Sequence, residues 1–195
     1  MSEHSSPSVK SPPITSAFPF PSYYNREPFF TLQPILNTQK KQLQMWQELI
    51  LSYTRYHKIY ELDINEYIKR GSELFNNEKI KRKLSQETIV AIFNEIVDSG
   101  YGEWLDKDKS RALVWWRKPD EWASIIYQWV VDSGQTDSIL TVWEIQKGDD
   151  TKNLEFHEIN TNILMKALKS LEKQGKAQIF SGSENNLGVK FFSTH

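Results

Sequence analysis

The residues that could carry chemistry are few and scattered along this chain of 195 residues. Cysteine is absent, which excludes disulfides, thiolate metal sites and cysteine nucleophiles. No Gly-rich phosphate loop, His-Glu-x-x-His motif or Gly-x-Ser-x-Gly motif occurs. The histidines are too far apart in the sequence to suggest a ligand set: His4, His57, His157 and His195. We therefore expect no enzyme, no metal site and no cofactor.

One acidic stretch superficially resembles the start of a calcium-binding loop. Asp106, Asp108 and Ser110 have the spacing of its first ligands. However, Arg111 stands where such a loop requires glycine, and Arg117 stands where it requires a bidentate glutamate. These two substitutions exclude a calcium loop.

A second acidic feature is the adjacent pair Asp149 and Asp150 in the polar stretch 148–153. Paired carboxylates can act as acid and base, but no convergent partner accompanies this pair. A solvated acidic loop is the simpler interpretation. The alternative is a contact with a basic partner helix, because residues 119–195 hold 7 basic and 11 acidic residues.

The basic residues gather in one place, before a predicted helix: Lys79, Lys81, Arg82 and Lys83. A solvated turn is the simpler interpretation, and a contact with phosphate or a lipid headgroup is the alternative. The net charge of the whole chain is −1, so no global field favours nucleic acid or anionic lipid.

The N-terminal part divides into a Ser/Pro-rich leader at 1–17, expected to be disordered, and a Pro/aromatic segment at 18–34. Proline restricts φ and removes a donor, so the segment favours an extended or polyproline-like chain. Its aromatic rings must nevertheless be buried somewhere. Either they cover the domain that follows, or they dock into another protein.

Apolar periodicity predicts four main helices, each with start and stop signals such as Ser85, Gly100 and Gly175. One or two further short helices are expected within 63–84. The main helices are predicted over 38–57, 85–99, 120–133 and 161–174. Strands are predicted over 59–62, 101–105, 111–116, 139–142, 177–180 and 188–192.

The order of these elements repeats along the chain. A helix, Gly100, a strand, a polar turn and a strand are matched by a helix, Gly175, a strand, a polar turn and a strand. Three helices followed by a hairpin are typical of a winged helix. We therefore predict an α+β protein with two tandem winged-helix domains, at 35–118 and 119–195.

Winged helices often bind DNA through the helix that precedes the hairpin, so a nucleic-acid-binding or transcription-associated protein is the alternative function. In the first domain this helix carries Glu87, Glu95 and Asp98 but no lysine or arginine. Phosphate contacts require cations. The equivalent helix of the second domain is mildly basic, with Lys166, Lys169 and Lys173 against Glu172, but residues 119–195 have a net charge of −4. We therefore expect no nucleic-acid partner.

Several motifs together carry a resemblance to one family, from about Pro21 to Phe192. The motifs are FFTLQP at 29–34, LFNN at 74–77, EWLDK at 103–107, WRKPDEW at 116–122, IYQW at 126–129, DSGQ at 132–135 and GVKFF at 188–192. In this order they resemble the small vacuolar-protein-sorting subunits of the ESCRT-II complex.

The resemblance implies a non-enzymatic subunit with two tandem winged-helix domains. Such subunits are present in two copies in a Y-shaped hetero-tetramer that sorts ubiquitinated cargo into multivesicular endosomes. The resemblance implies that the N-terminal part docks onto the two larger subunits and that the C-terminal domain recruits and activates the first ESCRT-III subunit. It also implies a cytoplasmic protein recruited to the endosome membrane, with indirect or peripheral membrane contact.

Two places in this sequence resemble the family's two Pro-x-x-aromatic docking motifs. They assign partner docking to Pro21, Tyr24, Pro28, Phe29 and Phe30. Ser22 and Glu27 depart from the family pattern, because a second proline is often found there. Charge alone suggests that Asp149, Asp150 and Glu155 contact the basic N-terminal half of an ESCRT-III subunit.

Overall fold

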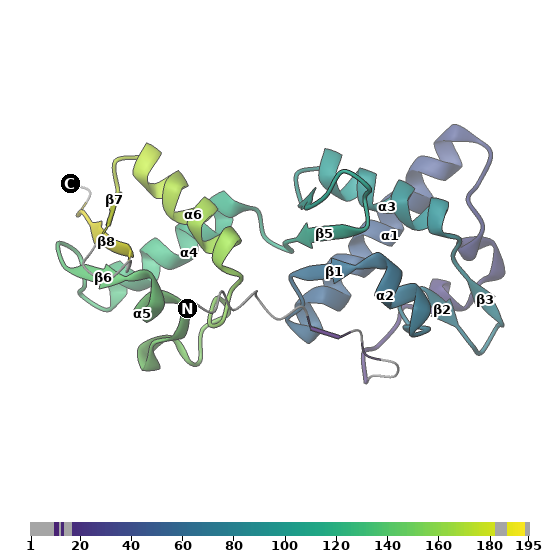
Figure 1. The fold of residues 1–195 in the computed structure, drawn as a ribbon, viewed down its shortest axis with the longest axis horizontal. Coiled ribbons are helices and arrows are strands. Elements are labelled where there is room, and N and C mark those ends of the chain that lie inside the picture. The colour runs from purple at the N-terminus through teal and green to yellow at the C-terminus, as the bar shows by residue number, and fades with distance from the viewer. Residues whose placement is uncertain (1–9, 12, 14–16, 182–186, 194–195) are drawn as a thin grey trace, which may run out of the picture. The chain divides into compact units, whose positions relative to one another are not determined.

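The computed structural model describes residues 10, 11, 13, 17–181 and 187–193 (Figure 1). Most of the predicted leader at 1–17 lies outside the described residues. The chain forms two compact units, one ending at Trp116 and the other beginning at Arg117. Each unit has its own helices and its own sheet.

The first unit begins with the Pro/aromatic segment, which is folded rather than extended. It contains two 3-10 turns, η1 (Ser22–Asn25) and η2 (Glu27–Phe30). The expectation of an extended, polyproline-like chain was therefore wrong for these residues. Pro28 lies in the first turn of η2, where its fixed φ suits the turn and no N–H is needed.

The three helices of the first unit begin or end at residues with capping or left-handed conformations. The helix α1 (Leu36–His57) ends at Lys58 in the left-handed conformation, with φ of 49°. The helix α2 (Ile64–Lys69) is capped by Asp63, and α3 (Gln86–Asp98) is capped by Ser85, whose side chain accepts from the Thr88 N–H. Gly100 follows α3 with φ of 79°, as its predicted role requires.

The strands of the first unit form a three-stranded sheet and a separate hairpin. The sheet has the order β1–β5–β4, from β1 (Glu61–Asp63), β4 (Gly102–Trp104) and β5 (Arg111–Val114). The hairpin joins β2 (Asn76–Asn77) and β3 (Arg82–Lys83). Sequence reasoning missed this hairpin, because four polar residues carry no alternating apolar pattern.

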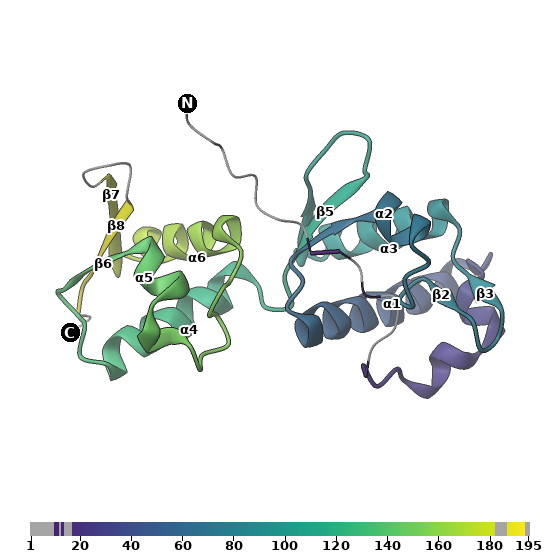
Figure 2. The same cartoon turned by 60° about the horizontal axis from the view of Figure 1, so that its bottom comes forward.

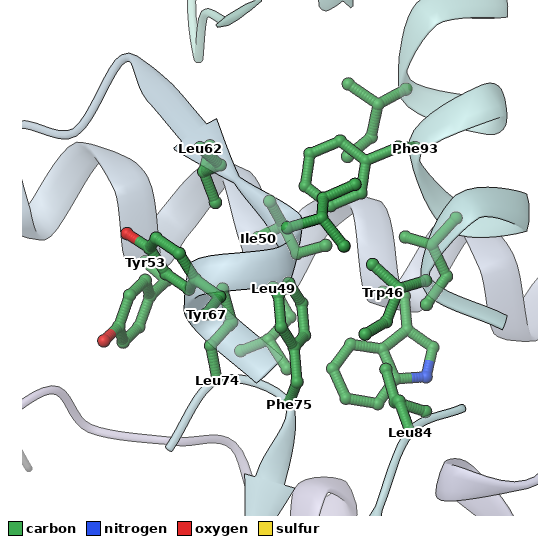
Figure 3. Close-up of a cluster of buried hydrophobic side chains, with 14 of the residues drawn as sticks. Trp46, Leu49, Ile50, Tyr53, Leu62, Tyr67, Leu74, Phe75, Leu84 and Phe93 are labelled. Atoms are coloured by element: carbon green, nitrogen blue, oxygen red, sulfur yellow. The ribbon is translucent and has the colours of Figure 1, made fainter. Parts of the chain in front are cut away.

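The core of the first unit is made of buried side chains from α1, α2, α3 and the sheet. The long helix α1 spans the unit along one side (Figure 2). Trp46, Ile50, Tyr53 and Tyr67 are completely buried in the core. Figure 3 shows these side chains facing Leu62, Leu74, Phe75 and Phe93 from the other elements. The one apolar face of α1 that its periodicity predicted is therefore the centre of this core.

The second unit repeats the arrangement. Its helices are α4 (Pro119–Asp132), α5 (Val142–Lys147) and α6 (Thr161–Lys173), with a 3-10 turn η3 (Asp149–Thr151). Its strands are β6 (Ile139–Thr141), β7 (Ala177–Ser181) and β8 (Leu187–Phe191). The sheet order is β6–β8–β7, and Trp122, Phe156 and Phe191 are completely buried.

The two sheets have the same topology. In each unit the short first strand pairs with the last strand of the hairpin, as Leu62 pairs with Ala112 and Leu140 with Val189. Three helices with this sheet form a winged helix. The prediction of an α+β fold with tandem winged helices is confirmed. Within the described ranges, no helix has both the length and the apolar character needed to cross a membrane.

Candidate docking surfaces

The predicted docking segment 18–34 is packed against its own unit. The side chains of Tyr24, Phe29 and Phe30 are 5%, 7% and 5% exposed. Tyr24 and Phe30 meet edge to face, with ring centroids 5.2 Å apart, and both rings also contact Trp46 of α1. In the chain by itself, these rings are part of the core.

Helix α1 holds the second motif through its side chains. Phe29 stacks on Trp46, whose indole N–H donates to the Phe29 carbonyl. The buried Gln42 amide donates to the carbonyls of Phe29 and Thr31, in each case at 2.9 Å. The backbone of the turn is thus satisfied by two side chains of one helix, which fixes its position.

The first motif is held by the β2–β3 hairpin and the loop before it. The Asn77 amide donates to the Tyr24 carbonyl at 2.9 Å, and the Tyr24 hydroxyl donates to the Glu73 carbonyl. Burial raises the pKa of the Tyr24 hydroxyl above its usual value of about 10, so it remains a donor even in alkaline solution. Arg82 forms an ion pair with Glu27 at 2.6 Å.

These contacts change how docking by the segment can occur. The sequence prediction placed the three rings in grooves of neighbouring chains, whereas the structure buries them in their own unit. The physical reason is that two 3-10 turns and the face of α1 give the segment a core to join. Of the prolines assigned to the two motifs, Pro28 is exposed and Pro21 is half-buried. Docking stays a prediction, and the solvent-facing side of the segment is the part available for it.

The acidic residues suggested for an ESCRT-III contact do not form a free cluster. Asp149 pairs with Lys152 at 2.7 Å, and this partner holds the pKa of the Asp149 carboxyl below its usual value. Glu155 pairs with Arg117 at 2.9 Å. Asp150 is exposed in η3. Two of the three predicted carboxylates are therefore engaged within the second unit.

Sequence reasoning missed the exposed apolar side chains of the second unit. Ile139 of β6 and Trp143 of α5 are each 61% exposed, and Phe180 of β7 is 37% exposed. In the sheet register, Ile139 and Gln178 both pair with Lys190, while Thr141 and Phe180 both pair with Gly188. Because paired residues share a face, Ile139 and Phe180 lie on the same outer face of the sheet. The signal in the sequence was a tryptophan at the start of a short predicted helix, between Val142 and Glu144.

The remaining candidates for chemistry stay separate. The His157 ring nitrogen Nδ1 lies 2.9 Å from the hydroxyl of Thr151, and His57 packs against Tyr53. The structure groups no three metal-binding side chains among the residues it describes. The arrangement offers surfaces rather than a reacting centre.

The comparisons with known proteins agree with this arrangement. A family model described as ESCRT-II complex subunit matches residues 23–160. The chain is 61% identical over 189 residues to vacuolar protein-sorting-associated protein 25 of Dictyostelium discoideum, covering 90% of this chain and 97% of the relative. It is 44% identical over 179 residues to the protein of the same name in Homo sapiens, covering 92% and 100%.

Solved structures give the same result. A crystal structure of subunit VPS25 of the endosomal trafficking complex ESCRT-II has a TM-score of 0.76 and 28% identity, covering 88% of this chain and 97% of that one. A chain in the crystal structure of the ESCRT-II complex (VPS22/VPS25/VPS36) has a TM-score of 0.73 and 30% identity, covering 86% and 96%. The relatives and the family model together show that this chain belongs to the family of ESCRT-II complex subunits.

Proposed function

We propose that this chain is a non-enzymatic subunit of an ESCRT-II hetero-tetramer that holds two copies of it and one of each larger subunit. In this assembly it takes part in sorting ubiquitinated cargo to multivesicular bodies. The protein acts in the cytoplasm and at the endosome membrane, with indirect or peripheral membrane contact. Support comes from the family and from solved relatives that are assembled with VPS22 and VPS36.

The first unit docks onto the larger subunits through the solvent-facing side of segment 18–34. The observation that carries this proposal is that the segment is already folded and anchored, with Pro28 exposed at its surface. A preformed surface loses less conformational entropy on binding than an extended peptide. Tyr24, Phe29 and Phe30 then contribute by holding the docking surface in shape.

The second unit recruits and activates the first ESCRT-III subunit. Its exposed apolar side chains, Ile139 and Phe180 on one face of the sheet and Trp143 on α5, support this role. Large aromatic side chains are frequent anchors in protein interfaces. The exposed Asp150 adds a negative charge that suits a basic partner, whereas Asp149 and Glu155 are already paired.

The docking proposal is tested by the double variant Pro21→Ala with Pro28→Ala, co-expressed with the two larger subunits. We expect co-purification to fall roughly tenfold, because a few central contacts dominate most interfaces. The matched control is Pro119→Ala, which removes a proline from the first turn of α4 in the second unit. Normal assembly of the double variant would rule out docking through this side of the segment.

Nucleic-acid binding is the rival function, and the charge of the first unit does not support it. The helix α3, which precedes the wing of the first unit, carries Glu87, Glu95 and Asp98 and no basic residue. Its charge opposes a phosphate backbone. Micromolar DNA binding with a steep salt dependence would favour the rival.

A further inference from the structure

A cavity of about 350 Å³ lies in the first unit, between the end of α2 and the β2–β3 hairpin. Its apolar lining includes the buried side chains of Phe75 and Leu84. Its polar lining includes Lys69, Arg70, Ser72, Asn76 and Lys83. Among the residues that the structure describes, no carboxylate lines it.

The hairpin divides its side chains between two faces. Asn76 pairs with Lys83, and Asn77 pairs with Arg82. Successive residues of a strand point to opposite faces, so these two pairs point in opposite directions. Asn77 and Arg82 contact the docking segment, whereas Asn76 and Lys83 line the cavity. The basic run in the sequence therefore divides in two: Arg82 contacts the docking segment, whereas Lys83 lines the cavity.

The polar groups of the cavity have unused binding capacity. Within the described part of the chain, Lys69 and Lys83 are in no ion pair, and the side-chain carboxamide of Asn76 makes no hydrogen bond, although its backbone N–H donates to the Ser72 carbonyl. Arg70 lies 3.7 Å from Glu66, with both side chains about 40% exposed. An exposed pair at this distance contributes roughly 0–1 kcal/mol, so Arg70 can turn to a stronger anion.

The neighbouring cavity is lined by residues of the opposite charge. This contrast indicates that the first cavity is the one that favours anions. It has a volume of about 250 Å³ and is lined by Phe20, Tyr24, Glu73 and Glu78, with no lysine or arginine among its described lining residues. Both cavities border on Gly71 and Asn76. The carboxylates are thus gathered on one side of Asn76 and the cations on the other.

We propose that the cavity at Lys69, Arg70 and Lys83 binds a small polyol that carries phosphate groups, such as an inositol phosphate. Phosphate oxygens accept charge-assisted hydrogen bonds from lysine and arginine, and the carboxamide of Asn76 supplies a further donor. The volume is in the range of small-ligand sites. The apolar lining provides a surface for the ring. The same phosphate chemistry occurs in soluble inositol phosphates and in the headgroups of phosphoinositide lipids.

The proposal is tested on the full chain, labelled with nitrogen-15 and titrated with inositol trisphosphate. We expect saturable shifts of the amide signals of Gly71, Asn76 and Lys83, which weaken as salt is added. A parallel titration uses phosphatidylcholine vesicles with and without phosphoinositide. Tighter binding to the phosphoinositide vesicles than to the free compound assigns a lipid source, and the reverse assigns a soluble one.

Two variants locate the site. Lys69→Gln and Lys83→Gln are each expected to weaken binding of inositol trisphosphate roughly tenfold, because each removes one charge-assisted contact. The matched control is Lys79→Gln, which removes an exposed lysine of the same hairpin that does not line the cavity. The control is expected to bind as the original chain does.

The proposal is overturned by an absence of saturable shifts, or by an equal loss of affinity in Lys79→Gln, which would indicate general attraction to a basic surface. Equal competition by an acidic peptide without phosphate would also overturn it, because the site would then be a protein contact. Thermal melts of the variants exclude unfolding as the cause of a loss.

Discussion

Phe29 and Trp46 stack face to face, with ring centroids 4.3 Å apart and ring planes 9° apart. The indole N–H of Trp46 also donates to the backbone carbonyl of Phe29 at 3.0 Å. One side chain of α1 therefore holds both the ring and the backbone of the same residue. This pair ties the N-terminal segment to the centre of the first unit.

Replacement of Trp46 by phenylalanine should loosen the segment. The change keeps an aromatic ring but removes the indole N–H and leaves part of the space empty. We expect the free energy of unfolding of the first unit to fall by about 2–4 kcal/mol. Hydrogen exchange of the α1 amides measures this for the unit by itself. The control is Trp143→Phe, at an exposed position, and equal effects of the two changes would contradict the role given to Trp46.

The double variant Tyr24→Ala with Phe30→Ala should destabilise the chain even without partners. Both rings are buried, so their removal leaves cavities in the core. Large-to-small changes of this kind cost about 3–5 kcal/mol each, and a pair in contact need not be additive. Thermal denaturation of the isolated chain gives the measurement. An unchanged melting temperature would show that the rings are free, as an extended docking peptide requires.

Trp143→Asp should weaken binding to the first ESCRT-III subunit without affecting stability. The side chain is 61% exposed, so the folded chain loses little on its removal. We expect affinity to fall at least roughly tenfold if this ring is a central anchor. Titration calorimetry provides the measurement. Val131→Asp, at a 43% exposed position of α4, is the matched control. A greater loss in Asp150→Lys than in Trp143→Asp would favour the acidic surface instead.

Stability should decrease at alkaline pH because of buried tyrosines. Burial raises the pKa of the hydroxyls of Tyr53 and Tyr67 above their usual value. A raised pKa means that the folded state favours the neutral hydroxyl. The contribution of these hydroxyls to the free energy of unfolding is therefore fully present below the unfolded pKa of about 10, and it decreases as the pH rises above that value. Tyr67→Phe should reduce the slope of stability against pH in that range. The matched control is Tyr56→Phe, which removes a hydroxyl at an exposed position.

The helices and the repeat could be predicted because their signals are local. Ser85 caps α3 and Gly100 ends it, as the sequence indicated, and Gly175 does the same after α6 with φ of 69°. An apolar residue at every third or fourth position indicates the buried face of a helix, even when the element that packs against this face is not known. The same local signals, repeated in the second half, were sufficient for the tandem winged helix.

The fate of the docking segment could not be predicted because it depends on a tertiary contact. Prolines near Tyr24 and Phe29 indicated an extended chain, but a 3-10 turn accepts proline in its first turn. Whether the rings are buried was decided by Gln42 and Trp46, whose side chains meet carbonyls that sequence spacing does not reveal. Tertiary packing therefore outweighed the local preference of the prolines for an extended chain.

The hairpin of β2 and β3 has a consequence for insertions and deletions. Its strands contain two residues each, and the turn at 78–81 sets which residue of β3 stands opposite Asn77. A shift of one position would exchange the directions of Arg82 and Lys83. Lys83 would then point toward Glu27, and Arg82 toward the cavity. The length of this short exposed turn thus determines which of the two neighbouring cations faces Glu27 and which faces the cavity. A substitution during evolution can change one of these two contacts alone only while that length is kept.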